Sequence, residues 1–269
     1  MHISRLYCYP IKSCGGIPLD AARVSLRGIL HDRAFAVVDT KTHKVLTQRE
    51  VPKLCLVRTE IDGEDLAFWT NGFDRLTTPL HRHEEAMYRP PPMEAVIWDE
   101  RVMVEDQGKW PSGWFSALLG RPCALVRLPE ARHPKGRDIN FADAYECLVI
   151  SEASLEDLNA RLETPVPMDR FRPNVVVAGC APYAEDGWGM VRLGGLHAEG
   201  ATPCVRCVIT TTDQRTAARA KEPLATLATY RRTAKGVIFG RNFSFLNGGC
   251  LQVGDAVVAV ESTGVPGTP

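Results

Sequence analysis

The segment Cys204-Val205-Arg206-Cys207 combines two thiols with a fixed positive charge inside four residues. The thiolate is the form of cysteine that binds metals and attacks electrophiles, and a neighbouring cation such as Arg206 favours that form. The run that follows, 208–212, is rich in β-branched residues, which suit a strand. We therefore expect the two thiols where a loop enters a sheet, and this segment is the strongest candidate for chemistry.

Several chemistries use such a cysteine pair. A structural zinc site needs a second Cys-x-x-Cys or a close histidine pair, but the remaining cysteines are scattered and His197 is the only histidine within ten residues. A thioredoxin-like pair would open a helix, which the β-branched run argues against. Two interpretations stay open: small residues that fill a core, and a single thiolate that binds a soft or redox-active metal bringing its other ligands with it.

Basic residues near predicted strand ends are the second candidate feature. Lys12 lies between a proline turn and the pair Gly15-Gly16, which can bring backbone N–H groups and an ammonium to one anion. Arg33 directly precedes an apolar run, and Arg170 and Arg172 bracket Phe171 before another. Guanidinium groups are preferred partners of phosphate. The alternative is that Arg33 and Arg170 pair with their neighbours Asp32 and Asp169, so the residues alone indicate an anionic ligand near a thiol without naming it.

Length and composition restrict the class of protein. A chain of 269 residues is long enough for two domains, and 45% hydrophobic residues can bury a substantial core. The formal net charge is zero, with 32 basic and 32 acidic residues, which argues against a general binder of nucleic acid or of membrane surfaces. The nine cysteines are odd in number and irregularly spaced, which suits a reducing compartment.

The start of the chain gives an expectation about location. Residues 1–5 are followed by polar Lys12 without the apolar stretch of a secretory signal, and no segment is long enough to cross a bilayer. We therefore expect a cytoplasmic protein without a membrane span.

The elements that must position these residues are mainly strands. Turn-bounded β-branched or alternating segments predict a β-rich α+β fold of sheets or barrels with a few packed helices. Asp99-Glu100 predicts a tight hairpin. Three helices are predicted. The first begins near Pro111 and ends at Gly120, the second begins with the capping box Ser154–Asp157, and the third follows Pro223. The strands are predicted at 23–26, 34–38, 54–61, 95–98, 101–104, 175–177 and 256–260.

Proline-bearing polar stretches suggest how the chain is divided. Residues 79–93 predict an exposed excursion, whose His81 and His83 we expect to be solvated, and residues 129–137 predict a linker. We divide the chain into domains at 1–125 and 126–262, with a frayed tail at 263–269.

Taken together and in order, six motifs resemble one family. They are Tyr9-Pro10-Ile11-Lys12-Ser13, Asp32-Arg33, Ser151-Glu152-Ala153-Ser154-Leu155, Phe171-Arg172-Pro173-Asn174, Cys204-Val205-Arg206-Cys207 and Lys221-Glu222-Pro223-Leu224. The chain is similar over nearly its whole length to MOSC-domain proteins, the molybdenum-cofactor sulfurase C-terminal type domains. The similarity is to the two-part group that includes the mitochondrial amidoxime-reducing component and its bacterial relatives. This resemblance implies an N-terminal β-barrel domain followed by a MOSC-type β-barrel domain.

The resemblance also implies a cofactor and its ligands. It implies a molybdenum cofactor, a pterin whose dithiolene sulfurs hold the metal and whose phosphate needs basic partners, with Cys207 as the protein ligand of molybdenum and the catalytic residue. Cys204 is then a packing or tuning residue, and Arg206 supplies charge beside the metal ligand. The implied cofactor-binding residues are Lys12, Ser13, Arg33, Asp143, Arg172, Asn174, Arg206 and Asn242.

The activity implied by the resemblance is the two-electron reduction of N-hydroxylated compounds, such as hydroxylamines, amidoximes and N-hydroxylated bases. Some bacterial relatives carry an appended iron–sulfur domain with Cys-x4-Cys-x2-Cys spacing, which this chain lacks, so we expect a separate electron-donor protein or reductase. The expected partners are this donor and a small-molecule substrate, without a nucleic-acid polymer. The alternatives are a persulfide sulfur-transfer module and a molybdenum-cofactor carrier.

Overall fold

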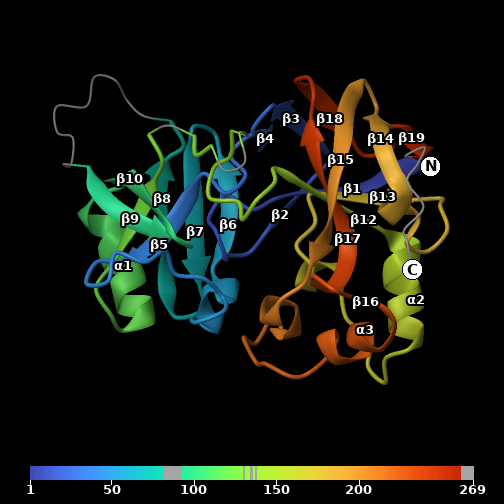
Figure 1. Cartoon of the computed structure of the whole chain (residues 1–269). Coiled ribbons are helices and arrows are strands. Elements are labelled where there is room, and N and C mark those ends of the chain that lie inside the picture. The colour runs from blue at the N-terminus through green and yellow to red at the C-terminus, as the bar shows by residue number, and fades with distance from the viewer. Residues whose placement is uncertain (82–91, 130, 134–135, 137, 262–269) are drawn as a thin grey trace.

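The computed structural model describes residues 1–81, 92–129, 131–133, 136 and 138–261. Figure 1 shows two lobes side by side, one with α1 (Lys109–Leu119) and the other with α2 (Glu152–Ala160) and α3 (Leu224–Tyr230). Strand residues far outnumber helical residues in both lobes, so the predicted β-rich α+β class is confirmed. In the described ranges, no helix combines the length and the apolar character that crossing a bilayer requires.

The N-terminal lobe contains two antiparallel sheets. The first has the spatial order β5 (Phe35–Asp39), β11 (Cys123–Arg127), β10 (Glu100–Asp106) and β9 (Met93–Ile97), and the second has the order β6 (Arg58–Asp62), β7 (Asp65–Thr70) and β8 (Phe73–Pro79). Helix α1 covers this lobe because Trp114 and Phe115 pack against Phe68 and Leu125 in one buried cluster. Gly120 ends the helix in the left-handed conformation typical of such ends.

The C-terminal lobe is built on a nine-stranded sheet. Its order is β19 (Val257–Glu261), β14 (Trp188–Leu193), β15 (Leu196–Val205), β17 (Gly236–Phe245), β12 (Cys147–Ser151), β13 (Val175–Ala178), β1 (His2–Cys8) and β2 (Ile17–Leu19), with β16 (Arg232–Thr233) paired to β17. A smaller sheet joins β18 (Gly249–Gln252), β3 (Ala21–Ser25) and β4 (Gly28–Ile29). Alternating side chains of these strands form one buried core.

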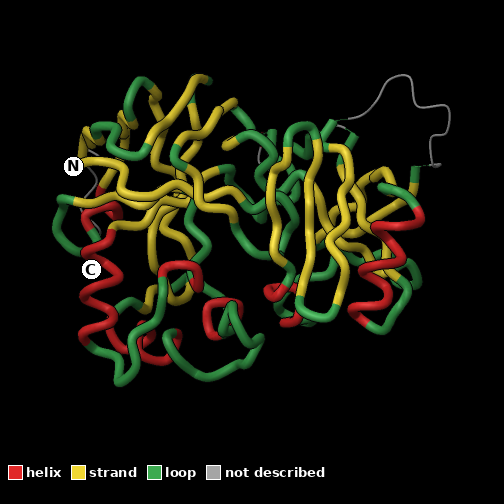
Figure 2. Tube along the Cα trace, turned by 180° about the vertical axis from the view of Figure 1, so that it is seen from behind, coloured by secondary structure: helices red, strands yellow, loops and turns green. Residues whose placement is uncertain are grey.

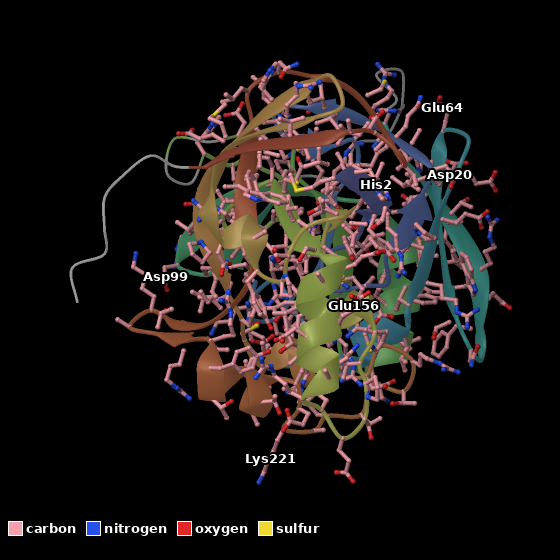
Figure 3. All side chains as sticks on the ribbon, turned by 90° about the vertical axis from the view of Figure 1, so that its right-hand side faces the viewer. His2, Asp20, Glu64, Asp99, Glu156 and Lys221 are labelled. Carbon is pink, nitrogen blue, oxygen red and sulfur yellow. The ribbon has the colours of Figure 1, made fainter. Side chains whose placement is uncertain are left out.

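Helices α2 and α3 cover a second core of the C-terminal lobe. Leu158 of α2 and Leu227 of α3 are fully buried there with Phe171 and Phe239. Figure 2 shows from behind that the helices lie outside the strands. Figure 3 has α2 toward the viewer, with Glu156 on its exposed outer side and Lys221 projecting from the segment that leads into α3. The two helices therefore cover one face of the large sheet, α2 on the flank away from the N-terminal lobe and α3 at the lower end in Figure 1.

The first strands of the chain belong to the C-terminal lobe. Strand β1 pairs with β13, Leu6 opposite Val175, and β3 pairs with β18, Val24 opposite Gly249. The domain boundary between residues 125 and 126 stays a prediction, but the lobes are not divided by one point in the sequence. Because the chain crosses between them, the segment after β1 is placed between the lobes. The predicted tail 263–269, most of the predicted excursion at 79–93 and part of the predicted linker at 129–137 lie outside the described residues.

Most predicted elements are found, with their ends shifted. The hairpin is confirmed, with Ile97 paired to Glu100 around the turn Trp98-Asp99. All three predicted helices are confirmed, but α2 is capped by Ser151, whose side chain accepts from the Ser154 backbone N–H, so the predicted start at Ser154 is wrong. The hydroxyl of Ser154 instead donates to buried Glu185 at 2.8 Å.

Tight turns shorten one predicted strand and replace another. Residues 54–61 begin in the 3₁₀ turn Pro52–Leu56, and the strand starts only at Arg58. The β-branched run after Cys207 forms the 3₁₀ turn Val208–Thr211. There the hydroxyl of Thr210 donates to the Cys207 carbonyl at 3.0 Å and that of Thr211 to the Val208 carbonyl at 2.8 Å. These local side-chain bonds compete with strand pairing and override the β propensity.

Candidate functional site

A cavity of about 390 Å³ is lined by residues of both lobes. Its size falls in the range of about 300–1,000 Å³ that small-molecule and cofactor sites occupy. The structure brings all the predicted site residues to this one cavity: Lys12, Ser13, Arg33, Asp143, Arg172, Asn174, Arg206, Cys207 and Asn242. They come from segments far apart in the sequence, which the crossing of the chain between the lobes draws together.

The end of β15 positions Cys207. Strand pairing holds the chain up to Val205, and the Arg206 backbone N–H then donates to the Val237 carbonyl at 2.7 Å. Cys207 follows in an extended conformation, and its carbonyl accepts from the Thr210 backbone N–H at 3.1 Å. Its thiol is partly exposed and lines the cavity. A rigid backbone therefore presents one accessible sulfur to any occupant.

The neighbouring Cys204 has different surroundings. It packs against the buried cluster that contains Phe171 and Phe239. Arg206 donates to the Sγ atom of Cys204 at 2.9 Å and to the Phe171 carbonyl at 2.7 Å. The guanidinium of Arg206 therefore donates to Cys204 and Phe171, although we expected its charge beside Cys207. Both cysteines are half-buried and line the cavity, but they are not equivalent, because the Cys204 thiol packs against a core cluster and already accepts from Arg206.

One wall of the cavity is a buried group that we call the Tyr9 cluster, made of Tyr9, Asp32, Arg33, Arg172 and Asn174. The guanidinium carbons of Arg33 and Arg172 lie 4.5 and 4.2 Å from the centre of the Tyr9 ring. The Tyr9 backbone N–H donates to Asp32 at 2.8 Å, and its hydroxyl donates to the Pro173 carbonyl at 3.0 Å. The ring therefore holds two cations side by side at the cavity wall.

Arg33 is paired inside this cluster. It forms an ion pair with Asp32 and donates to Asn174 at 3.0 Å and to the Arg172 carbonyl at 3.3 Å. Burial opposes its charge, but Asp32 outweighs burial and raises the pKa of Arg33. The alternative that Arg33 pairs with Asp32 is therefore confirmed, and the same side chain also faces the cavity. Arg170 pairs with Asp213 at 2.9 Å, so the predicted pairing with Asp169 is wrong.

Arg172 has one hydrogen-bond donor without a partner among the described residues. Its Nη1 atom donates to the Cys14 carbonyl at 2.6 Å, whereas its buried Nη2 atom has no partner among the residues that the structure describes. Burial lowers the pKa of this guanidinium. A buried donor without a partner costs free energy that an anionic ligand in the cavity would recover. Arg206, which lines the same cavity, likewise has a buried Nε atom without a partner among the described residues, so the two guanidinium groups together suit an anion.

Three cavity residues have strained backbone. Ser13, Arg33 and Arg172 adopt positive φ angles of 69°, 48° and 56°. Residues other than glycine rarely adopt this left-handed conformation, and such strain tends to concentrate at functional sites. Here it turns the side chains toward the cavity.

The other wall contains the Asp143 cluster, made of Lys12, Arg49 and Asp143. The Lys12 ammonium donates to the Phe141 carbonyl at 2.7 Å and forms an ion pair with Asp143, which also pairs with Arg49 at 3.2 Å. Burial lowers the pKa of Lys12. Burial favours the neutral form of Asp143, but the charges of Lys12 and Arg49 outweigh it and hold its pKa below the usual range.

Sequence reasoning missed Arg49 and Gln48. The Ser13 hydroxyl accepts from the Gln48 backbone N–H at 3.1 Å, and its carbonyl accepts from the Gln48 side chain at 2.7 Å. In the sequence Arg49 precedes Glu50, which suggests a local ion pair, yet Glu50 accepts from Thr47 instead. No local signal identifies either residue, because their place depends on pairing between the lobes. Asn242, which we predicted, lies 3.5 Å from the Thr202 hydroxyl.

The donor set indicates what the cavity can bind. Within the described ranges, no three His, Cys, Asp or Glu side chains form a metal-binding group. A metal bound at Cys207 would therefore bring other ligands with it, and the cations and the spare donor of Arg172 suit a negatively charged carrier. The residues fit a soft metal attached to an anionic group.

Two family models together match most of the chain. Residues 1–122 match the MOSC N-terminal β-barrel domain, and residues 136–258 match the MOSC domain. Mitochondrial amidoxime-reducing component 1 of Homo sapiens is 32% identical, over 95% of this chain and 82% of that protein. Mitochondrial amidoxime reducing component 2 of Bos taurus is also 32% identical, over 95% and 82%. Molybdenum cofactor sulfurase of Oryza sativa subsp. japonica is 31% identical, over 89% of this chain and 32% of that protein. The chain therefore belongs to the MOSC family, with a MOSC N-terminal β-barrel domain followed by a MOSC domain.

Proposed function

We propose that this protein is a molybdenum-cofactor-dependent oxidoreductase that reduces N-hydroxylated compounds. The observation that carries the proposal is the cavity that Cys207 lines together with several cationic side chains, of which Arg172 has a buried donor without a partner among the described residues. One soft ligand and one anion site are what a metal on a phosphate-bearing pterin needs. The names of the relatives, which are amidoxime-reducing components, support the substrate class.

Each cavity residue takes a role in this proposal. Cys207 is the protein ligand of the metal, and the bound cofactor would supply the two-electron redox chemistry. The spare donor of Arg172 and the ammonium of Lys12 bind the phosphate and pterin edges, with Ser13, Arg33 and Asn174 fixing their positions. The remaining cavity contacts of the cofactor are assigned to Asp143, Arg206 and Asn242.

The proposal includes partners and a location. Electrons come from a separate electron-donor protein or reductase, and the substrate is a small N-hydroxylated molecule. We place the protein in the cytoplasm, because nine irregularly spaced cysteines suit a reducing compartment. The proposed domains remain 1–125 and 126–262.

A second candidate function is sulfur transfer, with a persulfide on Cys207. The similarity to molybdenum cofactor sulfurase and the accessible thiol favour it. That sulfurase is about three times longer than the matched part, so its whole activity does not carry over to this chain. A carrier that holds the cofactor without turnover has the same cavity requirements.

A turnover assay separates these functions. Protein from a host that makes the cofactor is mixed with a reduced dye and either a hydroxylamine or an amidoxime, and dye oxidation is followed. We expect turnover by the wild type and by Cys204→Ala, and its loss in Cys207→Ala. A molybdenum-bearing wild type that is inert with both substrates would contradict the reductase proposal. Persulfide on Cys207 in that inert protein would favour sulfur transfer.

A further inference from the structure

Trp98 is an unusual residue type for the position that it occupies. It occupies the two-residue turn between β9 and β10, its side chain is 53% exposed, and its φ angle is 56°. A bulky aromatic residue in the left-handed region is an outlier, since glycine, asparagine or aspartate would fit this turn without strain. Backbone strain of this kind is often found at residues with a functional role.

The Trp98 ring packs on Arg49. The guanidinium carbon of Arg49 lies 4.4 Å from the ring centre, within cation–π range. The Nη2 atom of the same guanidinium donates to Asp143 at 3.2 Å. Only 22% of the Arg49 side chain is exposed. The aromatic ring and the carboxylate therefore hold the charged end of Arg49 in one place.

The backbone of Arg49 is tied to the C-terminal lobe. Arg219 donates to the Arg49 carbonyl at 3.0 Å and also to the Gln48 carbonyl. Arg219 follows the 3₁₀ turn that begins directly after Cys207, so the two segments are fixed relative to each other. Arg49 is thus anchored at its main chain and at its guanidinium.

This anchored cation lies beside Cys207. Both residues line the same cavity. The carboxylate of Asp143, 3.2 Å from the guanidinium, holds the charge of Arg49 at this cavity wall. The hydrogen bonds of Arg206 go to Cys204 and Phe171 instead. The cation next to the proposed metal ligand therefore comes from the N-terminal lobe.

We propose that Arg49, held by Trp98 and Asp143, is a positioning residue that keeps a positive charge beside the Cys207 sulfur and raises the reduction potential of a metal bound there. A fixed positive charge near a thiolate stabilises the more electron-rich, reduced state of its metal. The inference rests on the proposed function, because it needs molybdenum at Cys207. In this inference, Arg49 of the N-terminal lobe and the hairpin that carries Trp98 help to set the reduction potential of the metal.

The test is a redox titration of molybdenum-loaded protein, followed by the electron paramagnetic resonance signal of molybdenum. We expect Arg49→Gln to lower the midpoint potential and Arg49→Lys to restore most of the shift. Trp98→Ala should shift the potential in the same direction by less, because it frees the guanidinium without removing its charge. Trp98→Phe should stay close to the wild type.

Two matched variants control for general effects. Arg75 also stacks on a tryptophan, Trp69, and pairs with Glu60 and Asp62, but it does not line the cavity. Trp110 is 78% exposed on α1. Arg75→Gln and Trp110→Ala should leave both the molybdenum content and the midpoint potential unchanged.

The outcomes separate the two proposals. Molybdenum in the wild type with an unchanged potential in Arg49→Gln overturns the role of Arg49 alone. A folded wild type without molybdenum overturns the proposed function and this inference with it. If Arg49→Gln holds too little metal to titrate, retention in Arg49→Lys and in Arg75→Gln supports the inference, whereas equal loss in all three contradicts it.

Discussion

The two walls of the cavity hold their charges in different ways. In the Tyr9 cluster the cations are buried against an aromatic ring, and the Asp32 side chain is only 3% exposed. In the Asp143 cluster the carboxylate is 48% exposed and is shared by Lys12 and Arg49. The cations of both walls are mostly buried, so the difference lies in the carboxylates: Asp32 is enclosed by the fold, whereas Asp143 is open to solvent and to a ligand. A substitution in the Tyr9 cluster should therefore change both the stability of the protein and ligand binding. A substitution of Asp143 should change ligand binding with a smaller effect on stability.

Arg33→Leu should produce the largest effect, in the Tyr9 cluster. Removing one partner of a buried ion pair leaves the charge of Asp32 uncompensated, which costs about 3–5 kcal/mol. Urea denaturation of the variant should show a loss of that size in the free energy of unfolding. The matched variant Arg75→Leu breaks exposed ion pairs and should lose at most about 1 kcal/mol. Equal losses in both would show that burial adds nothing to the Arg33–Asp32 pair.

Gly16→Ala should have an intermediate effect on the same cluster. A Cβ atom at position 16 would overlap the Tyr9 ring, so the ring and the cations packed on it must shift. Overpacking of this kind costs about 1–3 kcal/mol of unfolding free energy. Gly113→Ala, on α1 where a Cβ meets no atom within 4 Å, should instead be neutral or stabilise by up to about 1 kcal/mol. A Gly16→Ala protein as stable as the wild type would show that the cluster is loosely packed.

The chemistry of the site was easier to predict than its geometry. Sequence motifs were enough to select Cys207, Lys12 and Arg172, because a thiol that can bind a metal and cations that can bind an anion are recognised by residue type. Arg49 and Trp98 could not, because Arg49 is a surface-type residue until a hairpin about fifty residues later packs on it, and such pairing across lobes leaves no local pattern.

Predictions from local propensity were wrong where side-chain hydrogen bonds changed the backbone conformation. The threonines after Cys207 favour a strand by propensity, but their hydroxyls bond to carbonyls three residues earlier and stabilise a turn. The order of strands in the large sheet was equally out of reach, because β1 pairs with β13 across more than half of the chain. Fold class, by contrast, depends on repeated local patterns and was predicted correctly.

Asp143→Asn should have the smallest effect, in the second cluster. The folded pKa of Asp143 lies below its unfolded value, so its ion pairs stabilise the protein above about pH 4 and that contribution is lost as the pH falls through the folded pKa. The carboxylate is half-exposed, and the oxygen of asparagine can still accept from the buried Lys12 ammonium, so we expect a loss of about 1 kcal/mol at pH 7. Thermal melts should show that the wild type loses more stability than Asp143→Asn on acidification from pH 7. High salt should shrink the difference, and a variant that melts like the wild type at every pH would contradict the pairing.

Elemental analysis of protein from a cofactor-making host tests the central claim most directly, which is that Cys207 holds molybdenum in the cavity between these walls. The account predicts roughly one molybdenum per wild-type chain, its loss in Cys207→Ala and its retention in Cys204→Ala. A well-folded wild type without molybdenum, or an equal loss from both cysteine variants, would contradict it.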